Sequence, residues 1–316
     1  MKQNLITYET YYGTSKKVAD IFSLILGNSK VVEVDKSNKD IKGYENIIMV
    51  FAFHGYKTAE KTKEYIKKNK DILKDKTIAL IGVGLRKKDI NNYSAKLLNV
   101  LDKNADIIEF IEGELRVSKL TEEDNKILGE FLTKENIKLM DMGKLKIGEA
   151  CSIACKCRET LNKPSTPLNE VELKNSIDEF IKEHNTCTLA TGYNDCIRAT
   201  PIEYTYVDRN LYFITEGGLK FNGILQNHNV SIAIYNSYTG MSNLKGLQIQ
   251  GEAEIIEIGS GEYKRVMEEK KLDEEKLEKL LVNLNMIKVR INRFEFLNSD
   301  FKKINVDVKQ ILKAQN

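Results

Sequence analysis

The sequence contains no tryptophan, only three histidines and three prolines, and no apolar run near the ~18 residues that a membrane-spanning helix requires. None of the histidines lies in a hydrolase motif, so a Ser-His-Asp or Cys-His catalytic arrangement is not expected. The N-terminus lacks a basic segment followed by an apolar core, which argues against an export signal. The 49 basic and 46 acidic residues leave a net charge of +3 without a long basic block, which disfavours nucleic-acid binding. These absences predict a soluble, cytoplasmic protein.

The length of 316 residues predicts two domains, each able to bury its own core. Two of the three prolines, Pro164 and Pro167, fall close together and mark a connection. We therefore divide the chain into a first domain over residues 1–148, a cysteine-containing linker over 149–170 and a second domain over 171–316.

In the first domain, short apolar runs alternate with amphipathic segments of helical spacing. The expected strands are residues 5–8, 31–34, 47–53, 78–83 and 107–111, and the expected helices are 15–26, 59–70, 93–101 and 122–132. This alternation is typical of a doubly wound parallel sheet in an α/β fold. Ligands of such sheets bind beyond the carboxyl ends of the strands.

The loop after the first predicted strand is rich in hydroxyl groups and opens a helix. Thr10, Gly13, Thr14 and Ser15 offer uncharged donors to a phosphate, whose charge the helix dipole favours. An ordinary capped helix start without a ligand explains the same residues, because Ser and Thr are common N-caps. Two further loops, residues 53–57 and 84–89, follow strands at the same predicted edge and are placed to enclose a ring.

The pattern Tyr8-x-Thr10-x-x-Gly13-x-Ser15-x-x-x-Ala19 resembles the flavodoxin signature, with serine where the family usually has threonine. The turn Phe53-His54-Gly55, followed by a lysine-rich helix and then by Ile81-Gly82-Val83-Gly84, resembles the subgroup that includes menaquinone-dependent protoporphyrinogen dehydrogenase. The resemblance implies that the FMN phosphate is held by Thr10, Tyr12, Gly13, Thr14 and Ser15, and that the isoalloxazine is bordered by Ala52, Phe53, His54, Gly55 and Gly84. An unliganded loop histidine is an equally good interpretation of His54.

Three of the five cysteines, Cys151, Cys155 and Cys157, lie within seven residues just before the prolines. Such a cluster could ligate a soft metal or an iron-sulfur cluster. It lacks a fourth nearby ligand and the usual two-residue spacing, so free thiols on a helix end are the favoured interpretation and no metal is assigned.

The second domain opens with a predicted helix, and short β-prone runs follow it. Its motifs follow in the order Arg198-Ala199-Thr200-Pro201, Leu211-Tyr212-Phe213-Ile214-Thr215, Lys220, Asn227-x-x-Val230 and Gln248-Ile249-Gln250-Gly251. This order resembles the pyridoxamine 5′-phosphate oxidase-like split β-barrel, a mainly β fold. The resemblance implies a second FMN site that includes Arg198, Thr200, Pro201, Thr215, Lys220 and Gln248. It also implies a homodimer, because such barrels usually build the site from two copies. An ordinary exposed lysine at 220 and an outward strand residue at 248 stay open as alternatives.

These patterns together predict an FMN-dependent flavoprotein oxidoreductase with one or two FMN per chain and a small-molecule or protein redox partner. Two alternatives stay open. The first is a protein that handles haem or a related tetrapyrrole, and the second is a non-enzymatic electron shuttle of the flavodoxin type.

Overall fold

The computed structural model describes residues 3–36, 41–53, 58–87, 90–134, 137–272 and 281–314. The chain divides into two compact units, Met1–Lys163 and Pro164–Asn316.

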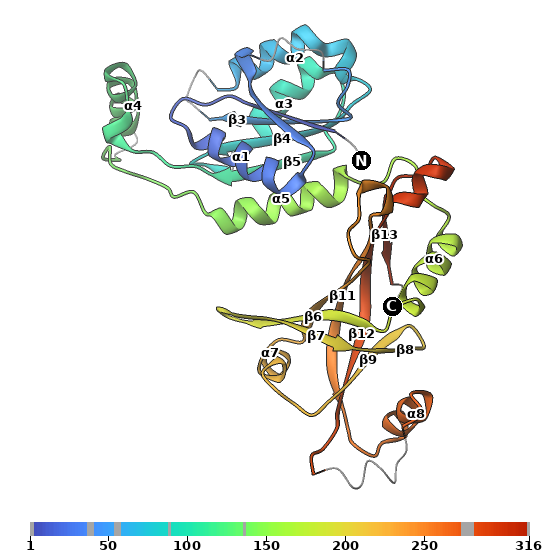
Figure 1. The fold of residues 1–316 in the computed structure, drawn as a ribbon. Coiled ribbons are helices and arrows are strands. Elements are labelled where there is room, and N and C mark those ends of the chain that lie inside the picture. The colour runs from blue at the N-terminus through green and yellow to red at the C-terminus, as the bar shows by residue number, and fades with distance from the viewer. Residues whose placement is uncertain are drawn as a thin grey trace. The chain divides into compact units, whose positions relative to one another are not determined.

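The first unit is built on a five-stranded parallel sheet with the order β2-β1-β3-β4-β5 (Figure 1). Its strands are β1 (Asn4–Tyr8), β2 (Ser29–Glu33), β3 (Asn46–Ala52), β4 (Thr77–Gly84) and β5 (Ile107–Glu112). This is the flavodoxin-like strand order, and it confirms the predicted doubly wound sheet.

Helices cover both faces of this sheet. On one face lie α1 (Thr14–Leu26) and α5 (Ile147–Leu161), and on the other lie α2 (Glu60–Leu73) and α3 (Ile90–Leu101) (Figure 1). The central strand β3 serves both layers, because Ile48 and Val50 pack in the α1/α5 core whereas Met49 and Phe51 pack in the α2/α3 core. Burial on both faces explains the uninterrupted apolar run in this strand.

A further helix, α4 (Glu122–Lys134), lies in the connection between β5 and α5 and stands apart from the two helix layers (Figure 1). Its amphipathic pattern predicted a helix. It did not predict that this helix leaves the sheet.

The cysteine-containing segment differs from the predicted linker. It forms α5, whose residues Ala150, Ala154, Cys157 and Leu161 are buried in the core of the first unit. The division between the units falls after Lys163, so the connection is much shorter than residues 149–170. The small side chains at 150 and 154 allow α5 to pack closely, and their spacing of four was the missed signal that this helix belongs to the core of the first unit.

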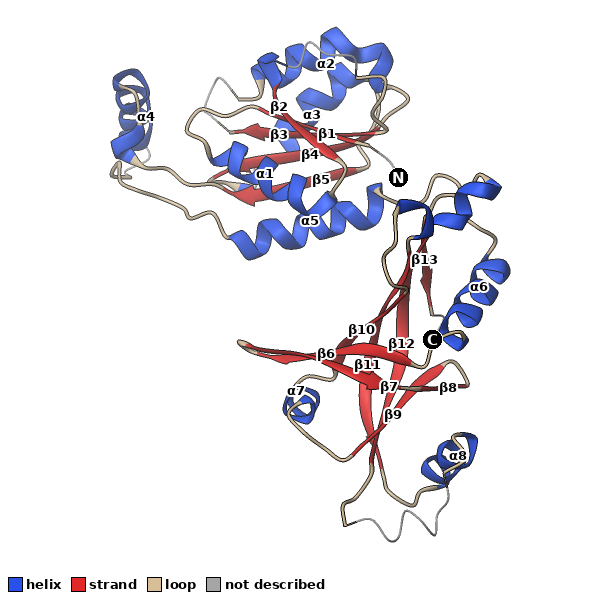
Figure 2. Cartoon of the chain, in the orientation of Figure 1, coloured by secondary structure: helices blue, strands red, loops and turns tan. Residues whose placement is uncertain are grey.

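The second unit opens with α6 (Glu170–Lys182) and continues as a curled antiparallel sheet, a half-barrel consistent with the predicted split barrel (Figure 2). The strand order is β7-β6-β10-β11-β12-β9-β8, with β13 paired to β12. The strands are β6 (Thr186–Tyr193), β7 (Cys196–Glu203), β8 (Thr205–Val207), β9 (Asn210–Thr215), β10 (Asn229–Tyr235), β11 (Lys245–Ile256), β12 (Asn285–Asn298) and β13 (Lys309–Lys313).

The long strand β12 joins two parts of this sheet. One of its edges pairs with β11, and the other pairs first with β9 and then with β13. Two helices lie between strands, α7 (Lys220–Gln226) and α8 (Gly261–Glu269). Short 3-10 segments complete the described elements at Val34–Lys36, Val117–Lys119, Met241–Asn243 and Ser299–Ile304.

Candidate functional site

The first unit contains a cavity of about 700 Å³ at the carboxyl edge of its sheet. The loops that follow β1, β3, β4 and β5 line it, together with α4. Its volume lies in the range of small-molecule and cofactor pockets. Of the residues predicted for the first site, Thr10, Tyr12, Thr14, Ser15, Ala52, Phe53 and Gly84 line this cavity.

One end of the cavity is the loop that opens α1. Gly13 adopts φ 91°, and its N–H donates to the Thr10 hydroxyl at 2.9 Å. No side chain caps α1, so the ordinary N-cap interpretation is not supported. The first-turn N–H groups of a helix have no intrahelical partners. The first two residues of α1, Thr14 and Ser15, also line the cavity and carry hydroxyl side chains. This arrangement fits a phosphate group.

The other end of the cavity is aromatic. Phe53 packs against Tyr93 with ring centroids 4.7 Å apart and against Phe110 at 5.7 Å. A Cβ atom at Gly84 would lie 2.6 Å from the Phe53 ring, so only glycine fits beside it. A flat, largely apolar ring system suits this end. The predicted residues His54 and Gly55 lie outside the described residues.

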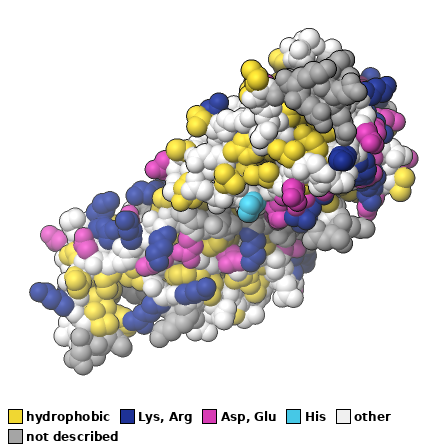
Figure 3. Space-filling view, turned by 90° about the horizontal axis from the view of Figure 1, so that it is seen from below, with side chains coloured by type: hydrophobic (Ala, Val, Ile, Leu, Met, Phe, Trp, Pro, Cys, Tyr) yellow, Lys and Arg dark blue, Asp and Glu magenta, His cyan; other side chains and the backbone are white. Residues whose placement is uncertain are grey.

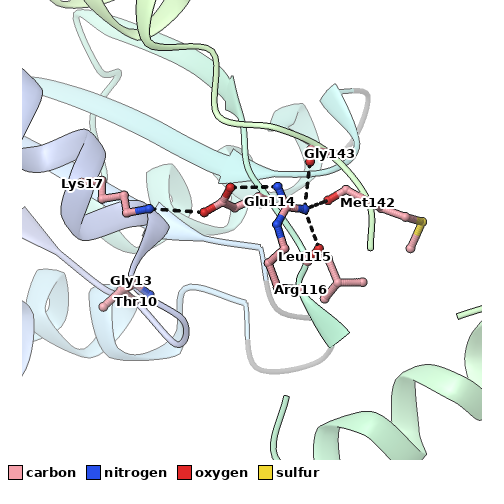
Figure 4. A network of polar contacts seen from close by, with 8 residues as sticks. All are labelled: Thr10, Gly13, Lys17, Glu114, Leu115, Arg116, Met142 and Gly143. Carbon is pink, nitrogen blue, oxygen red and sulfur yellow. Dashed lines mark hydrogen bonds and ion pairs between the residues drawn. The ribbon is translucent and has the colours of Figure 1, made fainter. Parts of the chain in front are cut away.

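A charged network after β5 borders the cavity and was missed by the sequence analysis (Figure 4). Glu114 accepts from Lys17 at 3.4 Å and from Arg116 at 3.1 Å. Arg116 also donates to the carbonyls of Leu115 at 2.9 Å and Gly143 at 3.2 Å, which ties together the two chain segments that flank α4. The position of Glu114 just beyond a parallel strand was the available signal.

Tyr11 and Tyr12 make polar contacts beside the cavity, in the loop over residues 10–15 that is called the phosphate loop below after its expected ligand. The Tyr12 hydroxyl donates to the Asp124 carboxylate on α4 and accepts from the Thr121 N–H at 3.3 Å. The Tyr11 hydroxyl donates to Glu9 at 3.4 Å. Burial and the nearby Glu9 carboxylate raise the pKa of Tyr11 to about 12, so the phenol stays protonated at physiological pH.

The cysteines of α5 differ in exposure. Cys155 is exposed, Cys151 is half-buried and Cys157 is buried. Burial raises the pKa of the Cys157 thiol to about 12, which opposes the thiolate that a metal needs. Over the described ranges, no three His, Cys, Asp or Glu side chains gather closely enough to hold a metal ion.

In the second unit, three of the predicted residues lie close together. Lys220 is only 6% exposed, which rules out an ordinary surface lysine. Its ammonium donates to the Gly217 carbonyl, which also lies 3.4 Å from the Thr215 hydroxyl. Burial and the positive charge of Arg198 lower the pKa of Lys220. A buried cation beside a second cation is a favourable setting for an anion.

Two shielded hydroxyls on the neighbouring strands lack partners. The Oγ1 atoms of Thr191 and Thr200 are buried, and neither makes a hydrogen bond in the structure. Thr191 lies opposite Arg198 in the β6–β7 register. A Cβ atom at Gly223 of α7 would lie 2.9 Å from Thr191, so this face is packed against the helix that carries Lys220. Unsatisfied buried hydroxyls are uncommon and fit a ligand that accepts from them.

The sheet register separates Gln248 from this cluster. Side chains alternate between the two faces of a strand. Thr200 pairs with Leu189, whose side chain is buried in the core. The next residue, Pro201, pairs with Thr188. Thr188 in turn pairs with Ala233, and Ala233 pairs with Gln248. Pro201 and Gln248 therefore lie on the outer face, opposite Arg198 and Thr200. The interpretation of Gln248 as an outward strand residue fits this geometry.

One of the two described histidines is fully engaged. His184 makes hydrogen bonds through both ring nitrogens, to Phe180 and Asn236, each at 2.8 Å. These bonds leave neither nitrogen open to a haem iron. His54 lies outside the described residues.

Comparisons with known proteins agree with the two-unit fold. Residues 5–138 match the family described as "Flavodoxin domain", and residues 173–298 match the family described as "Pyridoxamine 5'-phosphate oxidase". Both families point to flavin binding. No curated protein sequence matches the chain.

Solved structures resemble parts of the chain at low identity. HutZ, described as the heme storage protein from Vibrio cholerae, is 17% identical, with TM-score 0.33 over 38% of this chain and 89% of that one. A putative pyridoxamine 5'-phosphate oxidase from Listeria innocua is 18% identical, with TM-score 0.32 over 40% and 98%. General Stress Protein 26 from Bacillus anthracis is 20% identical, with TM-score 0.33 over 45% and 99%. Likenesses at this level carry no argument about function. Among the described helices, none combines the length and apolarity that crossing a membrane requires.

Proposed function

We propose that this chain, which joins a flavodoxin-like domain to a pyridoxamine 5′-phosphate oxidase-like domain, is an FMN-dependent oxidoreductase. It moves electrons between a reduced donor and a small-molecule or protein acceptor. The cavity of the first unit is the observation that carries the proposal, because it joins an uncapped helix start to an aromatic wall. Bound flavin supplies the redox chemistry, and the protein supplies binding, orientation and electrostatics.

In the first unit, the phosphate is held by the first-turn N–H groups of α1 and the hydroxyls of Thr10, Thr14 and Ser15. These donors are uncharged, and Lys17 in the first turn of α1 is paired with Glu114. Phe53 and Tyr93 border the ring and exclude water from one side of it.

In the second unit, Lys220 and Arg198 supply positive charge for a second FMN phosphate, and the hydroxyls of Thr200 and Thr215 supply neutral donors. Gln248 reaches that flavin from another copy of the chain, because it lies on the opposite face of its own sheet.

A homodimer through the outer face follows from this arrangement. Alternation along β7 and β10 places Ile197, 85% exposed, and the exposed Tyr235 on the same face as Gln248. Figure 3 shows that apolar side chains do reach the surface among charged ones. An outer sheet face with large exposed apolar residues is suited to burial against a second copy.

The absorbance spectrum and the flavin released per chain test the proposal on purified protein reconstituted with FMN. Two FMN per chain support both sites, and one identifies a single occupied unit. Ser15→Glu removes the site in the first unit and Lys220→Glu removes the site in the second, while Lys67→Glu on the exposed surface of α2 is the matched control. Light scattering reports whether the protein is a dimer. Absence of any FMN binding would overturn the proposed function.

A further inference from the structure

A buried carboxylate lies directly behind the phosphate loop of the first unit. Glu9 follows β1 and is only 1% exposed. It does not line the cavity, although the next residues, Thr10 and Tyr11, do. The proposed contacts to the cofactor leave Glu9 without a role, yet a buried carboxylate is costly unless it is well paired.

Glu9 is fixed by hydrogen bonds at both its backbone and its side chain. Its backbone N–H donates to the Val50 carbonyl on β3 at 2.9 Å. Its carboxylate accepts from the Thr62 N–H at 2.9 Å and from the Thr62 hydroxyl at 2.8 Å. The other carboxylate oxygen accepts from Tyr11 at 3.4 Å. Both oxygens of the buried carboxylate therefore have donors.

Thr62 lies in the first turn of α2 and is 2% exposed. The residue before this helix, Ala59, offers no side-chain cap. Glu9 therefore supplies the cap from 53 residues away in the sequence, at the helix end where the dipole favours negative charge.

This cap has a consequence for the geometry of the cavity. Phe53, which forms the aromatic wall, packs against the same core cluster as Ala59, the residue that precedes the start of α2. Glu9 fixes that start relative to the loop that carries Thr10. One buried side chain thus links the phosphate end of the cavity to the ring end.

We propose that Glu9 is a positioning residue for the flavin, which sets the spacing between the phosphate loop and the aromatic wall through its bonds to Thr62. The inference rests on flavin binding by the first unit. A role confined to fold stability would instead leave the affinity of the folded protein unchanged.

Titrations of the flavin-free, full-length protein with FMN and with riboflavin test this role, in a Lys220→Glu background that confines binding to the first unit. Riboflavin lacks the phosphate, so it reports the ring end alone. We expect Glu9→Ala to weaken both ligands about tenfold or more, which corresponds to about 1.4 kcal/mol. Ser15→Ala should weaken FMN and leave riboflavin unchanged.

Thr62 variants separate positioning from folding. Thr62→Val should reproduce the loss for both ligands, Thr62→Ser should keep wild-type affinity, and Glu9→Ala with Thr62→Val should be no weaker than Glu9→Ala alone. Glu33→Ala, which removes a carboxylate from the end of the neighbouring strand β2, is the matched control and should bind normally.

The outcomes distinguish the two proposals. Wild-type affinity for both ligands in folded Glu9→Ala and Thr62→Val proteins, with only a lower melting temperature, would overturn the positioning role and leave the flavin site intact. Absence of binding in the parent protein, with neither substitution, would overturn flavin binding by the first unit and the inference with it. If Glu9→Ala does not fold, the FMN and riboflavin affinities of Glu9→Gln, Thr62→Val and Thr62→Ser distinguish the positioning role from fold stability.

Discussion

The Tyr12 hydroxyl donates a hydrogen bond to the carboxylate of Asp124, which lies 112 residues later in the chain. The bond joins the phosphate loop to α4, the helix that stands apart from the layers of the first unit. Burial, and then the bond to Asp124, raise the pKa of Tyr12. The loop and the outlying helix are therefore linked directly at the cavity.

Tyr12→Phe should loosen α4 without unfolding the unit. A net hydrogen bond contributes about 0.5–1.5 kcal/mol, so we expect hydrogen exchange in α4 to become about 2- to 10-fold faster. Asp124→Asn should speed hydrogen exchange in α4 by a similar factor. The double variant should change the opening free energy of α4 by less than the sum of the two single changes. Because the folded pKa of Tyr12 is raised, the bond persists below about pH 10 and is lost as pH rises through the folded value. Equal effects from Glu122→Gln, an exposed control, would contradict the link.

Gly13→Ala should impair both stability and FMN binding. Gly13 has φ 91° with open space around its α-carbon, so the cost of a side chain is backbone strain of about 1–2 kcal/mol. Gly27, at the other end of α1, also has positive φ and open space, so Gly27→Ala is a matched control. Both variants should have a lower melting temperature. Only Gly13→Ala should bind FMN more weakly in a titration of the first unit's site. Equal FMN affinities of the two variants would show that the loop at Gly13 does not contact the cofactor.

Thr200→Val should have opposite effects on stability and binding. It replaces a buried hydroxyl that has no partner, so the free energy of unfolding of the flavin-free protein should stay level or rise by up to about 1 kcal/mol. FMN affinity of the second unit should fall several-fold. Thr186→Val, at the exposed start of β6, is the control. Thermal melts and FMN titrations of both variants check the prediction, and lower stability with unchanged affinity would contradict it.

Anion binding in the second unit should depend on pH through Lys220. Its lowered pKa means that the flavin-free protein binds fewer protons there than the unfolded chain does, so stability rises as pH increases through the folded value. A bound phosphate favours the charged ammonium, so binding takes up a proton and affinity falls over the same pH range. Calorimetry in buffers of different ionisation enthalpy measures that proton. Lys220→Met should abolish it, and an unchanged proton uptake would exclude Lys220 as the source.

Thiol reagents should distinguish the cysteines by exposure. Cys155 and Cys196 are exposed and should react first, whereas Cys157 and Cys187 are buried, and burial raises the pKa of each thiol to about 12. Mass spectrometry of native and denatured protein measures this order. Early labelling of Cys157 would contradict the packing of α5.

Local patterns were sufficient to predict both sheets and to place the loop that opens α1 at the carboxyl edge of the first sheet. The apolar run of β3 reflects burial on both faces of the strand, and the hydroxyl groups around Gly13 are close neighbours in the sequence. Each feature therefore leaves a local sequence pattern. Contacts between distant segments were not predictable in this way. The bond between Glu9 and Thr62, and that between Tyr12 and Asp124, require the relative placement of strand and helix ends, which no local pattern specifies.

The second site shows the same limit. The resemblance in motif order indicated Arg198 and Gln248 together, but sheet register decides on which face each lies. A shift of one residue in pairing would exchange the faces, and such a shift leaves no mark in a single sequence.

The packing of α5 also constrains the order in which the chain folds during synthesis. Ala150, Ala154, Cys157 and Leu161 complete the core beneath β1, β3 and β4, and the Asn162 side chain donates to the Leu26 carbonyl at 2.9 Å. The first domain therefore cannot close its core until its final helix has emerged from the ribosome. At about 5–20 residues per second, the second half of the chain then takes several seconds more to appear, so the flavodoxin-like domain has time to fold before its neighbour exists.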